Sequence, residues 1–270
     1  MVKIGFCSEE HAGGTAPVSA AEVSRSPAPR KSVVQVRFEG SGRSLAYYND
    51  RFDLRVGDLV FVEGSMEGSR GRVVEVNYNF KIRLSEYKRV IALADTEVHG
   101  EFFDAGSHFV TFDSSALPVE KVRTWFFSPS GGDEEFASGC DESAFPLDDL
   151  NEMPVAPQIA GRGHEYYTDS RVRYLSVTGT HGYAIVQGTE PYEVEFELSD
   201  GMVSCLTCTC FCSYNCKHEV AVMLQLRETL ELIGMHYADR YSDSGCFAAV
   251  AKSTLFSIAI DGRETSSFTL

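Results

Sequence analysis

The residues best suited to chemistry in this chain are concentrated between Cys205 and His218. Six of these fourteen residues carry a thiol or an imidazole that can bind a soft divalent metal: Cys205, Cys208, Cys210, Cys212, Cys216 and His218. Thiolate and imidazole donors in tetrahedral number are typical of zinc, with Zn–S distances of about 2.3 Å and Zn–N distances of about 2.0 Å. The cluster therefore predicts a closed structural zinc site.

Within the cluster, a C-x-C pair and a C-x-H pair are separated by a five-residue gap. We predict four ligands for one Zn²⁺ ion: Cys208, Cys210, Cys216 and His218. The pair Cys210 and Cys212 is an alternative, but it leaves only three residues to close the loop, and five turn more easily. On the preferred choice Cys205 and Cys212 are buried or spare thiols. A cysteine core without any metal is a further alternative, since free cysteine is commonly buried.

A strand, a turn and a helix must position these ligands. Alternating residues from Tyr192 to Leu198 predict a half-buried strand, and Asp200-Gly201 predicts a hairpin turn because this pair tolerates positive φ. The returning strand, from Met202 to about Thr207, leads to the cysteines. A helix is expected from Cys216, where free N–H groups and the helix dipole favour a thiolate.

The expected helix has a regular apolar stripe and a glycine near its end. The stripe consists of Val222, Leu226, Leu230 and Ile233. This spacing is typical of a helix that packs one face against a core, and Gly234 is placed to stop it. Farther on, the run that begins at Phe247 predicts a short helix or turn, and a C-terminal hairpin is expected around Asp261-Gly262.

The rest of the chain predicts an α+β protein of two domains. Residues 1–30 are expected to form a flexible leader, and residues 31–129 a small SH3-like β-barrel with a short α/β extension, because short alternating strands are separated by glycine turns. Residues 130–157 carry acidic side chains without a basic one and predict a linker, with an acidic interaction segment as the alternative. Residues 158–270 would form the zinc domain, with antiparallel strands ahead of a ββα unit.

The zinc domain resembles the SWIM zinc finger, whose pattern is C-x-C, a variable gap and C-x-H on a helix. The resemblance covers about residues 160–235. It is carried by Tyr166-Tyr167, Arg171-Val172-Arg173, Ala184 to Gly188, Tyr192 to Leu198, Asp200-Gly201, Cys208-Thr-Cys210, Cys216-Lys-His218 and Ala221. It implies a bacterial protein with a structural zinc that serves protein or nucleic-acid binding. The short gap departs from the family pattern, and the chain has no helicase or transposase motor, since a Gly-Lys-Ser/Thr phosphate loop is absent.

Charge favours a protein partner over a nucleic acid. The net charge is −15, and between Glu165 and Ile233 four basic residues face ten acidic ones. Nucleic-acid binding normally requires the opposite balance. The alternative is that nucleic acid binds the first domain, where residues 31–94 contain eleven basic and eight acidic residues. That alternative would involve Arg37, Arg43, Arg70 and Arg72.

The sequence predicts no catalytic residues, no cofactor-binding residues beyond the zinc ligands, and no small-molecule substrate. A thiol nucleophile with a histidine base would need Cys140 or Cys246 beside His164, His181 or His236, and no local motif joins them. The aromatic triplet that begins at Trp125 is expected to close a core, with base or ring stacking as the alternative. No signal-like or membrane-spanning apolar run is found, so we expect a cytoplasmic protein whose cysteines remain thiolates.

Overall fold

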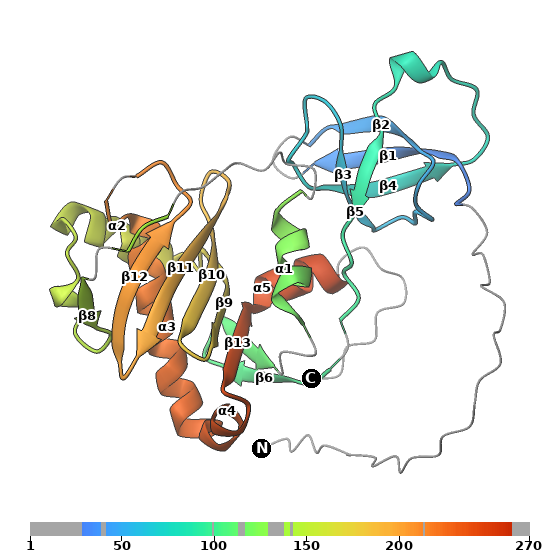
Figure 1. Cartoon of the computed structure of the whole chain (residues 1–270). Coiled ribbons are helices and arrows are strands. Elements are labelled where there is room, and N and C mark those ends of the chain that lie inside the picture. The colour runs from blue at the N-terminus through green and yellow to red at the C-terminus, as the bar shows by residue number, and fades with distance from the viewer. Residues whose placement is uncertain are drawn as a thin grey trace, which may run out of the picture.

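The structure is a computed structural model that describes residues 29–38, 42–98, 100–112, 117–128, 138–140, 143–212 and 214–260. It is an α+β protein with two antiparallel sheets, one of five strands and one of eight (Figure 1). Almost all of the predicted leader and the predicted hairpin around Asp261-Gly262 lie outside the described residues. Among the described residues, no helix is long and apolar enough to cross a membrane.

The first sheet contains five strands in the order β2-β1-β4-β3-β5. Their bounds are β1 Ser32–Phe38, β2 Ser44–Asn49, β3 Leu59–Val62, β4 Gly71–Asn77 and β5 Val90–Leu93. Alternate residues of β1 are buried, as the sequence pattern predicts. A Cβ at Gly71 would lie 2.3 Å from Cγ1 of Val36, so only glycine lets β4 pass this close to the β1 side chains. The short 3₁₀ helix η1, Leu84–Glu86, precedes β5.

The predicted barrel is not closed among the described residues. β5 forms its antiparallel ladder with β3, whereas its link to β2 among the described residues is a single parallel bridge between Tyr48 and Arg89, the residue before β5. A closed barrel needs a continuous ladder between its first and last strands. The N-terminal unit is therefore an open antiparallel sheet, and the predicted small SH3-like β-barrel is not closed among the described residues.

The second sheet positions the predicted metal ligands. Its strand order is β6-β7-β13-β9-β10-β11-β12-β8. The bounds are β6 Phe102–Ala105, β7 Phe109–Phe112, β8 Ala144–Pro146, β9 Val172–Thr178, β10 His181–Gln187, β11 Pro191–Ser199, β12 Met202–Cys208 and β13 Cys246–Ala251. The turn between β11 and β12 has positive φ at Asp200 and Gly201, as the Asp-Gly pair predicts.

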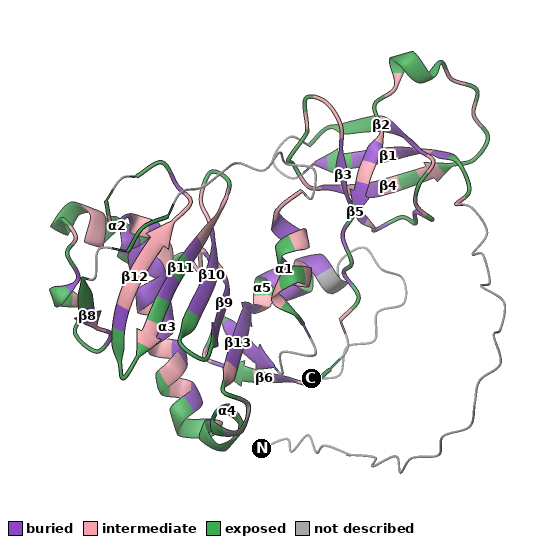
Figure 2. Ribbon diagram, viewed as in Figure 1, coloured by how far each residue is buried: buried purple, intermediate pink, exposed green. Residues whose placement is uncertain are grey.

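Helices cover both faces of the second sheet (Figures 1 and 2). Their bounds are α1 Val119–Phe126, η2 Leu150–Glu152, α2 Pro157–Thr168, α3 Lys217–His236, α4 Ala238–Ser244, α5 Lys252–Leu255 and the π-helix η3 Phe256–Ile260. Val222, Leu226 and Ile233 of α3 belong to the core on one face, whereas Val122 and Trp125 of α1 belong to the core on the other face. The central strands are therefore buried on both sides.

Two predictions about secondary structure between residues 217 and 251 are wrong. Helix α3 continues through Gly234 to His236, and the N–H of Tyr237 caps it by donating to the carbonyl of Ile233 at 2.7 Å. The run from Phe247 is not a helix or turn but the middle of β13. Because β13 lies between β7 and β9 with helices on both faces, its side chains are apolar without alternation, a pattern that hides a strand.

The domain boundaries predicted from the sequence do not coincide with the division of the strands between the two sheets. Strands β6 and β7 fall in the segment assigned to the first domain, but they pair with each other, and β7 pairs with β13 in the second sheet. Strand β8 falls in the segment assigned to the linker and pairs with β12. The pairings of β7 with β13 and of β8 with β12 join residues far apart in sequence, and local composition does not reveal them.

The aromatic triplet closes a core, as predicted. Trp125 is fully buried and its Nε1 donates to the carbonyl of Asp95 at 2.7 Å. The same core receives Leu59 of the first sheet and Ile185 of the second. This cluster therefore connects the two sheets.

Candidate metal centre

The first two predicted ligands are fixed by the end of β12. Cys208 is the last residue of β12 and lies opposite Val194 of β11. The next residue, Thr209, exchanges two hydrogen bonds with Glu193: its N–H donates to the carbonyl of Glu193 at 3.0 Å, and its hydroxyl accepts from the Glu193 N–H at 2.9 Å. The backbone between Cys208 and Cys210 is thereby held against β11.

The other two predicted ligands are fixed by the start of α3. Cys216 is the N-cap residue, and its N–H donates to Oε2 of Glu219 at 2.7 Å. The Cys216 side chain accepts in turn from the N–H of Glu219, which completes a capping box. His218 then lies in the first turn, on the buried side of the helix.

The four side chains converge on one point. The sulfurs of Cys208, Cys210 and Cys216 and a ring nitrogen of His218 all lie within 4.8 Å of one another. Nδ1 of His218 is 3.7 Å from the sulfur of Cys208 and 3.7 Å from the sulfur of Cys216. Tetrahedral zinc with ordinary bond lengths separates a sulfur ligand from a nitrogen ligand by about 3.5 Å. The donor set and its spacing fit one zinc ion.

Two tyrosines and a glycine fix the imidazole of His218. The ring of Tyr192 stacks on it with centroids 4.4 Å apart, and Tyr166 meets it edge-on at 5.4 Å. A Cβ at Gly188 would lie 2.8 Å from the Tyr192 ring and 3.1 Å from Nε2 of His218. These neighbours restrict rotation of the imidazole ring, and in the orientation that they fix Nδ1 faces the sulfurs. Among the described residues Nε2 has no hydrogen-bond partner.

The three thiols shift one another's pKa values. The pKa of Cys216 is lowered to about 4, first because its sulfur accepts a hydrogen bond from Cys208 and also because of His218 and the N–H of Glu219. The pKa of Cys208 is raised, first by that same hydrogen bond and then by burial. Burial raises the pKa of Cys210 to about 12. Only one thiolate is thus favoured without a cation, whereas a dication among the sulfurs would stabilise all three.

The two remaining cysteines of the cluster lie outside this group. Cys212 is exposed on the loop between the two ligand pairs. Cys205 has positive φ and lies in a bulge of β12, where two residues of β12 oppose the single residue Phe196 of β11. A bulge redirects a side chain away from the regular pleat. Cys205 is therefore separated from the ligands that follow it.

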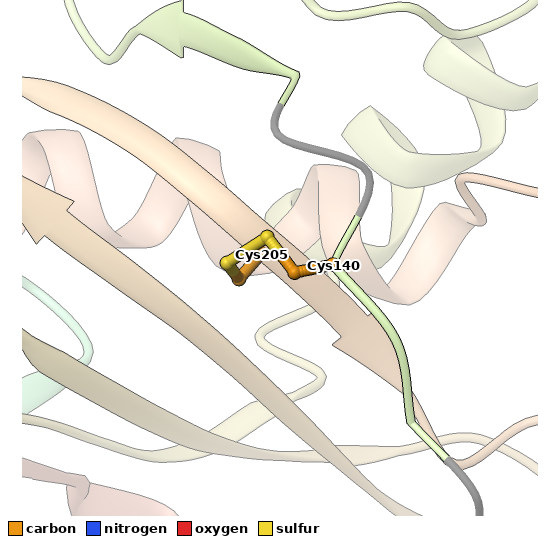
Figure 3. The surroundings of a disulfide bond; sticks show 2 residues. All are labelled: Cys140 and Cys205. Carbon is orange, nitrogen blue, oxygen red and sulfur yellow. A yellow bond between two sulfur atoms is a disulfide. The ribbon is translucent and has the colours of Figure 1, made fainter.

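Cys205 forms a disulfide with Cys140 (Figure 3). The expectation that the cysteines remain thiolates is therefore wrong for this pair. The reason is tertiary: Ala144 of β8 pairs with Ser204 of β12, which brings Cys140 within 4.7 Å of Cys205 between Cα atoms. Sixty-five positions separate the two cysteines, and no local spacing pattern indicates their pairing.

We expect Cys140→Ser to destabilise the oxidised protein. A crosslink across 65 positions contributes about 4 kcal/mol in the chain-entropy description, so the variant should melt at a lower temperature than the parent without reductant. Thermal unfolding with and without reductant measures this difference, and Cys212→Ser is the matched control because its thiol is exposed. Identical melting of parent and Cys140→Ser without reductant would contradict the crosslink.

The residues considered for thiol catalysis are distributed over several elements. Cys140 is in the disulfide. In the sheet register Thr178 of β9 lies between Cys246 of β13 and His181 of β10, and the Thr178 hydroxyl is 3.3 Å from the Cys246 sulfur. His164 lies on α2, where it packs against Tyr167, and His236 is the last residue of α3.

A pocket of about 510 Å³ lies on the face of the second sheet that α1 covers. Two of its charged side chains form an ion pair: Arg123 Nε lies 2.7 Å from Oε1 of Glu193, and the Tyr183 hydroxyl donates to the same oxygen at 2.6 Å. Burial, followed by this hydrogen bond, raises the pKa of Tyr183. The network joins α1 to β10 and β11 and so has a structural explanation.

The geometry defines the class of site: a buried Cys3His group of the kind found in zinc fingers. Comparison with models of protein families, with curated proteins and with solved structures found no match. The sequence pattern indicated all four residues of this group. The resemblance included Tyr166 and Gly188, but nothing in the sequence indicated their contacts with His218, nor the disulfide of Cys140, because these arise through tertiary packing.

Proposed function

We propose that the chain is a SWIM-type zinc-finger protein that binds one structural zinc ion and acts as a protein-binding module. The observation that carries the proposal is the convergence of three sulfurs and one nitrogen, from the end of β12 and the start of α3, within 4.8 Å. Zinc there would offset two of the three thiolate charges and hold strand, loop and helix together. Four protein ligands fill a tetrahedral shell and leave no position for a catalytic water. The proposed role is therefore structural and non-enzymatic.

Metal analysis and partner capture test this proposal together. Purified protein should contain one zinc ion per chain, and the zinc-loaded full chain should retain a specific protein from extracts of its source cells. Half of the extract should be treated with nuclease beforehand. Retention that survives nuclease treatment is the expected result. A chain without stoichiometric metal, or retention abolished by nuclease, would overturn the corresponding half of the proposal.

No specific observation favours nucleic-acid binding by the first sheet. Two of the four arginines considered for it bind the protein itself. Arg70 donates to the carbonyl of Trp125, and Arg72 donates to the carbonyls of Gly57 at 2.8 Å and Ser257 at 2.5 Å. Guanidinium groups held in this way are less available to phosphates.

We accordingly expect no gel shift of single- or double-stranded DNA or RNA with micromolar protein at low salt. Low salt favours phosphate contacts most strongly, so the conditions give nucleic-acid binding its best chance. A shift that weakens steeply with added salt and with Arg37→Gln or Arg43→Gln would restore the alternative. Both residues are exposed on the first sheet or its turn.

A further inference from the structure

A pocket of about 630 Å³ adjoins the metal centre. Three of the four predicted ligands form part of its wall: Cys210, Cys216 and His218. Its apolar wall is completed by Pro154, Val155, Ile159 and Tyr192. The pocket thus lies between the start of α2, the start of β11 and the loop that leads into α3. Its volume is in the range of sites that hold a few side chains or a small ligand.

Two aromatic side chains at this pocket point into solvent. Phe211 is 93% exposed and Tyr214 is 89% exposed, far more than any other exposed large hydrophobic residue among those described, the next being Met235 at 60%. Both line the pocket. Exposed aromatic side chains beside an apolar depression are typical of protein-binding surfaces, where they supply much of the contact area. A ligand that contacts both side chains would therefore extend beyond the pocket.

The charge of the pocket is opposite to that of the whole chain. Arg162 and Lys217 are the basic side chains among the described lining residues, and no carboxylate lines the pocket, although the net charge of the chain is −15. Zn²⁺ with three thiolates would leave one net negative charge, which these two positive side chains outweigh. The ammonium of Lys217 is held 4.5 Å from the centre of the Tyr166 ring. A basic pocket on an acidic protein selects a negatively charged ligand, since other parts of the surface repel it.

The predicted zinc ligands fix the loop that carries the aromatics. Cys210 and Cys216 enclose the loop, and the side-chain amide of Asn215 donates to the carbonyl of Pro154 at 3.1 Å. Phe211 follows Cys210 and Tyr214 precedes Asn215, so both lie next to these fixed points and lose less further entropy when a ligand binds. The metal centre therefore provides a fixed support for Phe211 and Tyr214.

We propose that this pocket binds a short peptide segment of a partner protein in which a large apolar side chain is flanked by carboxylates. The apolar side chain would enter the depression between Tyr192 and Ile159 and contact the exposed aromatics, while the carboxylates would face Arg162 and Lys217. This inference rests on the proposed protein-binding function and names the chemistry of the partner. It assigns recognition to the loop between the two ligand pairs.

Selection from a random 12-residue peptide library displayed on phage, with the zinc-loaded full chain as bait, tests the proposal. Enriched peptides should carry a net negative charge and at least one large apolar residue. A synthetic copy of the most enriched peptide, labelled with fluorescein, then gives an affinity by anisotropy. Enrichment of neutral or basic peptides, or of none, would overturn the proposal.

Variants of the pocket locate the binding site. Phe211→Ala and Tyr214→Ala should each weaken binding of the labelled peptide about tenfold, the size expected of central interface aromatics. Arg162→Glu should weaken it about fivefold and reduce its salt dependence. Two matched controls lie elsewhere, Met235→Ala for an exposed apolar side chain and Arg51→Glu for an exposed basic one, and both should leave the affinity unchanged. Metal analysis of each variant confirms that the centre is intact.

The possible results of these experiments distinguish failure of the pocket proposal from failure of the proposed protein-binding function. Peptides that bind but are insensitive to Phe211→Ala, Tyr214→Ala and Arg162→Glu would leave protein binding in place and refute this pocket. Binding that occurs only with the full chain as its own ligand, seen as dimerisation by light scattering, would replace the partner peptide by a second copy. A zinc-loaded chain that retains a protein from extracts but enriches no peptide would refute the pocket and leave the protein-binding role in place.

Discussion

Replacing Cys216 with serine should reduce the metal content from one zinc ion per chain to none. Cys216 is 2% exposed and is both a predicted ligand and the N-cap of α3, so its loss removes a buried donor and weakens the helix start. Structural zinc contributes about 10–16 kcal/mol in isolated finger peptides. Here α3 is also stabilised by packing on the second sheet, so we expect the variant to lose only a fraction of this free energy of unfolding. A loss of even 3 kcal/mol lowers the melting temperature by about 6–12 °C for a chain of this size.

Inductively coupled plasma analysis and calorimetry measure these effects, and His218→Ala should behave in the same way. The matched control is Cys212→Ser, four positions before Cys216, because Cys212 is exposed and outside the group of four. It should keep its zinc and its melting temperature. Loss of zinc from Cys212→Ser together with retention in Cys208→Ser would mean that the ligand pair is Cys210 and Cys212.

Gly163→Ala should destabilise the second sheet and its helices by about 3 kcal/mol. Gly163 is buried where α2 crosses α3, and a Cβ there would lie 2.4 Å from Cβ of Val220 and 3.1 Å from the carbonyl of Lys217. Neither contact can be relieved by a side-chain rotation alone, because Cβ of Val220 and the carbonyl belong to the helix itself. Overpacking of this kind typically costs about 1–3 kcal/mol, occasionally more. Denaturant unfolding monitored by circular dichroism measures it.

Gly161→Ala is the matched control for Gly163→Ala. It lies on the same helix, and a Cβ there meets nothing within 4 Å. Alanine should therefore stabilise the helix by about 0.5–1 kcal/mol through its higher propensity. Helix α2 packs against the first turn of α3, which carries the predicted ligand His218. Gly163→Ala should therefore also weaken zinc retention against a chelator, whereas Gly161→Ala should not. Equal stability of the two variants would contradict the close helix crossing.

Parts of the fold could be predicted because they depend on local pattern. The alternation in β1 and β11 follows from one face being buried, and the turn at Asp200-Gly201 follows from its backbone preference. The apolar stripe of α3 indicates a helix that packs on a core. Its end was misplaced at Gly234, since packing overrides a single glycine, whose cost in a helix is only about 1 kcal/mol.

Other parts could not be predicted because their causes are non-local. Strand β13 is apolar on both sides since helices cover both faces of its sheet, and the resulting sequence lacks a strand period. Strands β6 and β7 join the second sheet only by pairing with β13, which follows them by more than a hundred residues. The N-terminal sheet remains open because a single bridge, between Tyr48 and Arg89 next to β5, links its two edges. The sequence pattern predicts strands but not how the two edge strands meet.

The sequence by itself determined the candidate metal site: ligand types, their spacing and the strand-turn-helix that carries them all lie within a short segment, and such local geometry is fixed by backbone rules. The tertiary structure alone decided what surrounds the site. Tyr192 and Tyr166 meet His218 through strand register and helix packing, and Cys140 reaches Cys205 through the pairing of β8 with β12. The basic pocket beside the exposed Phe211 likewise exists only because three distant segments converge there.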